Sequence, residues 1–80
     1  MTFNFYYRIG CHLCDDMYDL IVSYQADNSF KINRINIDKD LSLQDKYSLL
    51  IPVLTDDLNN EICHYFFDKV SFERCLQNNT

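Results

Sequence analysis

The alternation of apolar and polar residues predicts a strand at the start of the chain, and a helical repeat follows it. Within residues 2–7, Phe3, Phe5 and Tyr7 fall on one face of an extended segment. From residue 12 to about residue 26, the spacing of apolar residues becomes that of an amphipathic helix. The expected apolar positions of this helix are Leu13, Met17, Leu20, Ile21 and Tyr24.

The remaining elements follow from the same patterns. Residues 30–37 are rich in Ile and predict a second strand. Its alternation slips between Ile32 and Ile35, so we expect either a bulge or a strand limited to the second half. The other predicted elements are a short helix over residues 38–47, strands over 53–55 and 61–66, and a last helix from Asp68 with Val70, Phe72, Cys75 and Leu76 as its apolar positions. The final residues, 78–80, should fray.

The predicted order is βαβαββα in one domain, residues 1–80. A βαβ unit requires parallel strands joined by a right-handed crossover, and the second half adds a hairpin and a packing helix. We therefore expect an α/β fold with a four-stranded mixed sheet and helices on both faces. Hydrophobic residues make up 48% of the chain, with one Gly and one Pro, which fits a dense core without long flexible loops.

The clearest chemical signal is Cys11-His12-Leu13-Cys14, which lies where a predicted strand ends and a helix begins. The free N–H groups and the positive dipole end of a helix N-terminus favour a thiolate, so Cys11 is the expected nucleophile. Cys14 lies about one turn further along and points more toward the core, which suits a resolving thiol. His12 would stabilise the thiolate if protonated, or it is simply an exposed residue of the first turn. Such a motif beside a βαβ pattern is typical of thioredoxin-like redox proteins, although C-x-x-C pairs also bind metals.

Charge and hydropathy exclude several kinds of partner. The formal net charge is −5 and the chain has no run of Lys or Arg, which argues against nucleic acid and anionic membranes. No segment approaches the roughly 20 apolar residues that span a bilayer, and the N-terminus does not resemble a signal peptide. We therefore expect a cytoplasmic monomer, in which a close Cys pair is more often catalytic or metal-binding than structural.

Residues 6–16, Tyr-Tyr-Arg-Ile-Gly-Cys-His-Leu-Cys-Asp-Asp, resemble the opening of glutaredoxins. Together with segments 35–38 (Ile-Asn-Ile-Asp) and 51–54 (Ile-Pro-Val-Leu), they resemble a small glutaredoxin-like family of the thioredoxin superfamily over nearly the whole chain. The resemblance implies a thioredoxin-like fold and a thiol–disulfide oxidoreductase in which Cys11 attacks and Cys14 resolves. The substrates it implies are protein disulfides or low-molecular-weight thiols such as glutathione, with no bound cofactor or metal.

The resemblance also implies further site residues. Pro52 would be the cis-proline beside the dithiol, with the Ile51 backbone free to pair with an extended substrate; a trans proline at the start of an edge strand is the alternative. Arg8 would meet a substrate carboxylate, or it is a solvated surface charge. Glutathione-binding glutaredoxins carry paired glycines and then an Asp before the last helix. We take the turn at residues 59–60 (Asn-Asn) as the counterpart, and it predicts weak glutathione binding.

The other two cysteines, Cys63 and Cys75, are expected to be buried free thiols that pack as small hydrophobic groups. A disulfide between them, or a metal site shared with the first pair, is the alternative. His64 should point to the opposite face of the sheet from Cys63, which disfavours a shared metal. Two other functions stay open: a metal or iron–sulfur carrier that uses Cys11, and a thioredoxin-fold binding module without turnover.

Overall fold

The computed structural model describes residues 1–78 and confirms the predicted order of elements. Their bounds are β1 (Thr2–Tyr7), α1 (His12–Ser23), η1 (Tyr24–Ala26), β2 (Lys31–Asn36), η2 (Ile37–Lys39), α2 (Leu41–Tyr47), β3 (Val53–Asp56), β4 (Glu61–His64) and α3 (Lys69–Asn78), where η1 and η2 are single 3₁₀ turns. Helix α3 includes Asn78, where the expected fraying stays a prediction, and for residues 79 and 80 it lies outside the described part of the chain.

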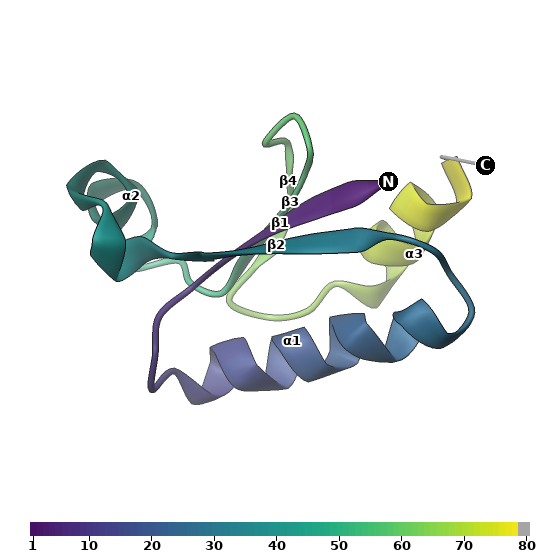
Figure 1. Cartoon of the computed structure of the whole chain (residues 1–80), viewed down its shortest axis with the longest axis horizontal. Helices are drawn as coiled ribbons and strands as arrows, with labels where there is room; N and C mark the ends of the chain where they lie inside the picture. Colours follow the sequence, from purple (N-terminus) through teal and green to yellow (C-terminus); the bar gives the residue numbers. More distant parts are fainter. Residues whose placement is uncertain (79–80) are drawn as a thin grey trace.

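The four strands form one mixed sheet in the order β2-β1-β3-β4. Strand β1 pairs parallel with β2 and antiparallel with β3, and β3 pairs antiparallel with β4. Figure 1 shows α1 running along one side of the sheet and α2 on the other. The α/β thioredoxin-like fold, with helices on both faces, is therefore as predicted.

The larger core lies between the sheet and the helices α1 and α3. Phe72 of α3 is fully buried there, and its ring centroid lies 5.0 Å from that of Phe3 and 5.1 Å from that of Tyr24. The other buried members of this core are Phe5, Cys14, Met17, Ile21, Phe30, Leu54, Cys63 and Leu76. Cys14 belongs to this core, so the packing that stabilises the fold also holds one end of the candidate dithiol.

The smaller core lies on the opposite face, under α2, and is built from Tyr6, Ile37, Tyr47 and Val53. Asp40 caps α2, because its Oδ1 accepts hydrogen bonds from the N–H groups of Ser42 at 2.9 Å and Leu43 at 3.3 Å. The hydrogen bond from the Ser42 hydroxyl, followed by these backbone donors, holds the pKa of Asp40 below its ordinary value. This cap explains why α2 begins at Leu41, three residues later than the expected start at residue 38.

Strand β2 corrects the expectation of a bulge or a shortened strand. All six of its residues pair in continuous register with β1, from Lys31 opposite Thr2 to Asn36 opposite Tyr7. Ile32 packs against the larger core and Ile35 against the smaller one. The slip in the apolar pattern arises because these two residues are three positions apart, which places their side chains on opposite faces of the strand.

Three apolar positions expected in helix cores are exposed instead. In α1, Leu13 and Leu20 are 37% and 49% exposed, while Cys14 and Met17 are buried. In α3, Val70 is 65% exposed, and Phe72 and Leu76 face the core as expected. The buried face of α1 is therefore turned toward Cys14, which leaves Leu13 and Leu20 at the surface.

Candidate active site at the N-terminus of helix α1

Cys11 is the N-cap residue of α1. Its φ of −95° and ψ of 106° are extended, and its Sγ accepts a hydrogen bond from the backbone N–H of Cys14 at 3.1 Å. Ser, Thr, Asp or Asn usually fills this position, and here a sulfur does. The N–H of Cys14 and the positive end of the helix dipole both stabilise negative charge on the Cys11 sulfur.

Gly10 makes the approach to this cap possible. Its φ is +84°, in the left-handed region where a side chain is disfavoured and Gly is not. The tight loop after β1 therefore delivers Cys11 to the first turn of α1. The loop is predicted from the sequence, but the role of Gly10 follows only from its backbone conformation.

Cys11 and Cys14 form a disulfide with a Cα–Cα distance of 5.2 Å. Cys14 is 1% exposed, and Cys11 is partly exposed. The two sulfurs thus differ in access: a reagent in solvent can reach Cys11, while Cys14 is covered by the core. His12 is exposed as the first residue of α1, beside this pair.

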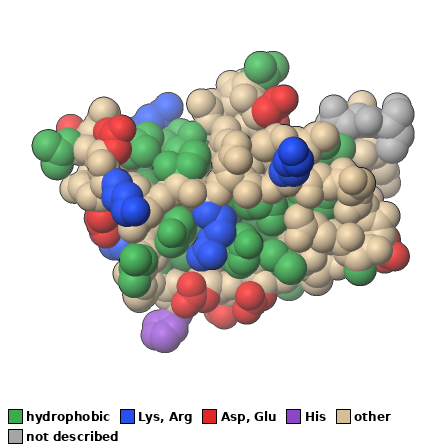
Figure 2. Space-filling model, viewed as in Figure 1, with side chains coloured by type: hydrophobic (Ala, Val, Ile, Leu, Met, Phe, Trp, Pro, Cys, Tyr) green, Lys and Arg blue, Asp and Glu red, His purple; other side chains and the backbone are tan. Residues whose placement is uncertain are grey.

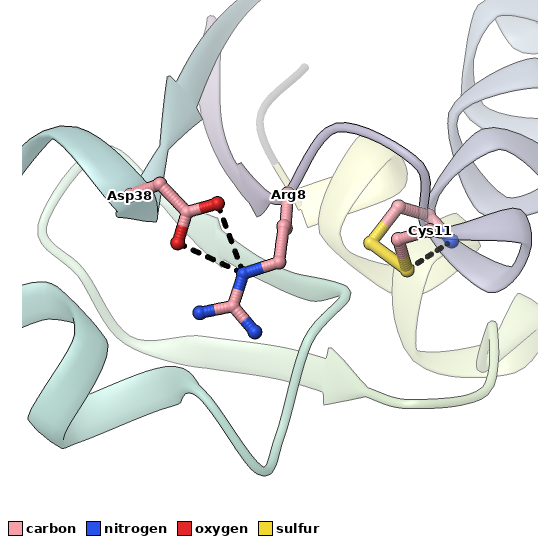
Figure 3. The surroundings of a disulfide bond; sticks show 4 residues. Arg8, Cys11 and Asp38 are labelled. Atoms are coloured by element: carbon pink, nitrogen blue, oxygen red, sulfur yellow. Dashed lines mark hydrogen bonds and ion pairs between the residues drawn. A yellow bond between two sulfur atoms is a disulfide. The ribbon is translucent and has the colours of Figure 1, made fainter.

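Arg8 forms a salt bridge with Asp38, which lies in η2 just after β2. The Nε of Arg8 lies 2.9 Å from Oδ1 and 3.0 Å from Oδ2 of Asp38, and both side chains are partly exposed. Figure 3 shows Arg8 between Asp38 and Cys11, with the outer nitrogens of the guanidinium turned away from the carboxylate. The Nε of Arg8 is therefore occupied by a carboxylate of the chain itself, and the contact with a substrate carboxylate stays a prediction for the outer nitrogens. Asp38 lies at the start of a helix predicted from the sequence, and no local pattern indicates its pairing with Arg8.

The Ile51–Pro52 peptide bond is cis, as expected. Val53, the next residue, pairs with Tyr6, so the proline lies at the end of the sheet from which the loop to Cys11 leaves. The expectation of a free Ile51 backbone is wrong in one respect, because the Ile51 N–H donates to the carbonyl of Tyr47 at 3.0 Å. Among residues 1–78, no N–H donates to the Ile51 carbonyl, and this group remains to accept a hydrogen bond from a substrate.

The turn at residues 59–60 is not part of this site. It joins β3 to β4 beside the start of β1, where Phe3 pairs with Asp56, and this is the end of the sheet opposite the dithiol. Asn59 has a φ of +62° and its Oδ1 accepts hydrogen bonds from Tyr6 Oη at 2.7 Å and Asn4 Nδ2 at 3.1 Å. This turn is structural, so the prediction of weak glutathione binding cannot rest on it.

The segment before α3 lies at the dithiol end instead. The Tyr65 N–H donates to the carbonyl of Pro52 at 2.8 Å, and the Phe66 N–H donates to the carbonyl of His64 at 2.6 Å. Tyr65 has a φ of +66°, a conformation that costs a bulky residue about 1–3 kcal/mol. This three-residue turn ends β4 at His64, two residues before the predicted end. The turn contains no Gly, so the apolar pattern predicts a strand that continues through it.

Neither Cys63 nor Cys75 is part of a disulfide; Cys63 is buried as expected, whereas Cys75 is only partly buried. Burial raises the pKa of both thiols, and for Cys63 it outweighs the hydrogen bond from the backbone of Asp68. His64 is exposed and its Nδ1 lies 2.9 Å from Oε2 of Glu61, so it faces away from buried Cys63. Within residues 1–78, no group of three or more His, Cys, Asp or Glu side chains is arranged to hold a metal ion.

Comparison with known proteins agrees with this geometry. Residues 2–77 match the family model described as Glutaredoxin-like domain (DUF836). The chain belongs to this glutaredoxin-like family. A comparison with curated proteins gives no match.

Solved structures from several organisms are similar to this glutaredoxin-like domain. The solution structure of protein Ne2328 from Nitrosomonas europaea is 34% identical, with a TM-score of 0.83 over 94% of this chain and 89% of that one. The X-ray structure of protein XcR50 from X. campestris is 29% identical, with a TM-score of 0.70 over 95% of this chain and 96% of that one. Thioredoxin 1 from Thermosipho africanus, at 18% identity and a TM-score of 0.65 over 99% of this chain and 98% of that one, supports the fold alone.

Proposed function

We propose that this glutaredoxin-like domain is a thiol–disulfide oxidoreductase. The observation that carries the proposal is the unequal access of a cysteine pair at a helix N-terminus. Cys11 is partly exposed and its sulfur accepts a hydrogen bond from an N–H group, while Cys14 is buried one turn away. An accessible, stabilised thiolate is the attacking group in thiol–disulfide exchange, and a shielded neighbour is the resolving group.

The exchange takes two steps. In the first, the Cys11 thiolate attacks one sulfur of a substrate disulfide; a Cys11–substrate disulfide forms, and the second substrate sulfur leaves as a thiolate with the electron pair. In the second, Cys14 loses its proton and attacks Sγ of Cys11, which forms the Cys11–Cys14 bond and releases the other substrate sulfur as a thiolate. Two electrons pass from the protein to the substrate, and the reaction runs backward with a more oxidising partner.

The proposed substrates are protein disulfides or low-molecular-weight disulfides such as those of glutathione. Arg8 and the Ile51 carbonyl are the proposed substrate contacts: Arg8 through the guanidinium nitrogens that Asp38 does not bind, and Ile51 as an acceptor for a substrate N–H. We assign this activity to the cytoplasm, where the reduced dithiol is the resting form. Within residues 1–78, no helix is long and apolar enough to cross a bilayer.

The test is a redox titration combined with a turnover assay. The Cys11–Cys14 pair is equilibrated with glutathione buffers of graded ratio, quenched with acid and alkylated, and the oxidised fraction is measured by mass spectrometry. We expect one reversible two-electron transition and turnover of a peptide–glutathione mixed disulfide. A pair that stays in one state across the series, without turnover, would contradict the proposal. An absorbance spectrum of the freshly purified protein tests the alternative, because an iron–sulfur carrier is coloured.

A further inference from the structure

A groove next to the dithiol is lined by apolar side chains from two elements. One wall is a stripe of α1 formed by Leu13, Met17 and Leu20, and the other is the segment of residues 65–67 before α3. Its volume is about 170 Å³. An engineered apolar cavity of roughly 150 Å³ in another protein holds one benzene molecule. The groove therefore has room for one large apolar side chain.

The large side chains at this groove remain exposed although they are apolar. Phe66 is 70% exposed, Leu20 49% and Tyr65 45%, and buried Met17 lies beneath them. Large apolar side chains that gather at the surface are typical of interaction sites. The turn at Tyr65 holds Phe66 in this place with a backbone conformation that a bulky residue disfavours.

Both walls begin at the dithiol. Leu13 lies between Cys11 and Cys14 in the first turn of α1, and the opposite wall is tied to Pro52 by the Tyr65 N–H. From Leu13 to Leu20 the stripe extends along α1 by about 10 Å, the length of about three residues in an extended chain. A substrate joined to Cys11 can therefore lay the residues next to its own cysteine along the groove.

The charge of the rim is negative. Asp16 lines the groove, Asp15 and Asp19 are exposed on the same helix, and none of the lining residues is Lys or Arg. Figure 2 shows acidic side chains gathered along the lower edge of the molecule, where α1 runs. Glutathione, with two carboxylates and one ammonium group, is repelled by this rim, whereas Lys or Arg in a polypeptide is attracted.

We propose that this groove binds a substrate polypeptide with a large apolar side chain within about three residues of the reacting cysteine and a basic side chain beside it. The inference rests on the proposed function, since the groove acts only on what reaches Cys11. It adds a preference: basic, apolar protein segments are the substrates, ahead of glutathione.

The test uses three short peptides whose single cysteine forms a mixed disulfide with thionitrobenzoate. The first carries Leu and Lys beside the cysteine, the second replaces Leu by Ala, and the third replaces Lys by Glu. Reduced, desalted protein is mixed with each peptide. The Cys11 thiolate attacks the peptide sulfur, the peptide–thionitrobenzoate bond breaks, and the coloured thionitrobenzoate anion leaves with the electron pair. Its release gives a second-order rate constant for each peptide.

We expect the first peptide to react about tenfold faster than the second, a preference of ~1.4 kcal/mol. The variants Leu20→Ala and Phe66→Ala should each lose most of this preference. Leu58→Ala is the matched control, because Leu58 is 78% exposed in the hairpin at the other end of the sheet. Asp16→Asn and added salt should each reduce the preference for the first peptide over the third.

Each contrary outcome points to a different error. Equal rates for the three peptides, unchanged by Leu20→Ala, would overturn the groove proposal and leave the oxidoreductase in place. If the protein releases thionitrobenzoate neither from the peptides nor from a glutathione–thionitrobenzoate disulfide, both the groove proposal and the oxidoreductase proposal are overturned. Sedimentation that shows a dimer dispersed by Phe66→Ala would mean that a second copy occupies the groove, which contradicts the proposal.

Discussion

Replacing Phe72 by Ala tests how the candidate site is supported. The Phe72 ring is fully buried, with its centroid 5.0 to 5.8 Å from those of Phe3, Tyr24, Phe30 and Phe67. Truncating such a residue typically costs about 3–5 kcal/mol in the free energy of unfolding. A domain of this length has a total of about 4–12 kcal/mol, at roughly 0.05–0.15 kcal/mol per residue. We therefore expect Phe72→Ala to remove a large share of the stability.

The measurement is urea unfolding followed by circular dichroism, on the oxidised and the reduced protein. Val70→Ala is the matched control, because Val70 lies on the same helix and is 65% exposed. It should change the free energy of unfolding by no more than about 0.5 kcal/mol. A loss of less than about 1.5 kcal/mol for Phe72→Ala, or equal losses for both variants, would refute the assignment of Phe72 to the core, since buried Phe truncations normally exceed this value.

Two further predictions concern reactivity and pH. Alkylation of the reduced protein at mildly acidic pH, followed by peptide mapping, should modify Cys11 before Cys14. Cys11 is partly exposed and its sulfur accepts a hydrogen bond from a backbone N–H group, whereas Cys14 is buried. Earlier modification of Cys14 would reverse the assigned roles. Hydrogen bonds from the backbone and hydroxyl of Ser71 lower the pKa of Asp68, and the hydroxyl of Ser42 does the same for Asp40. Because the folded pKa of each carboxyl lies below the unfolded one, this stabilisation is present above about pH 4 and is lost as the pH falls through the folded values. The free energy of unfolding, measured in urea by circular dichroism, should therefore fall in this pH range. The fall should be smaller for Asp68→Asn, which lacks one of the two carboxylates.

Most of the fold could be predicted from the sequence, because the patterns are local. The apolar alternation of β1 and the helical spacing of α1 each report which side of an element is buried. Strand β2 was misjudged for a physical reason: Ile32 and Ile35 pack on opposite faces of the sheet, so the apolar residues do not alternate regularly. The exposed positions Leu13 and Leu20 misled because an apolar stripe does not distinguish a core from a docking surface.

The candidate site was predictable where its chemistry is carried by neighbours in sequence. Cys11, Cys14 and the cis bond before Pro52 followed from a motif and a resemblance. The partner of Arg8 is 30 residues away and depends on the register of β2 against β1. The turn at Tyr65 has a conformation that usually requires Gly, so no residue type in the sequence indicates it. The Asn-Asn pair at residues 59–60 is the more obvious turn in the sequence, although it lies at the other end of the sheet.

The central claim, that Cys11 attacks and Cys14 resolves, is tested most directly by trapping the intermediate. Cys14→Ser and Cys11→Ser are each mixed with a peptide–glutathione disulfide, and the products are analysed by intact-mass spectrometry and peptide mapping. We expect Cys14→Ser to accumulate a covalent adduct at Cys11, because the resolving thiol is absent, and Cys11→Ser to remain unmodified because buried Cys14 is shielded. An adduct at Cys14 in Cys11→Ser, or no adduct at Cys11 in Cys14→Ser, would contradict the account.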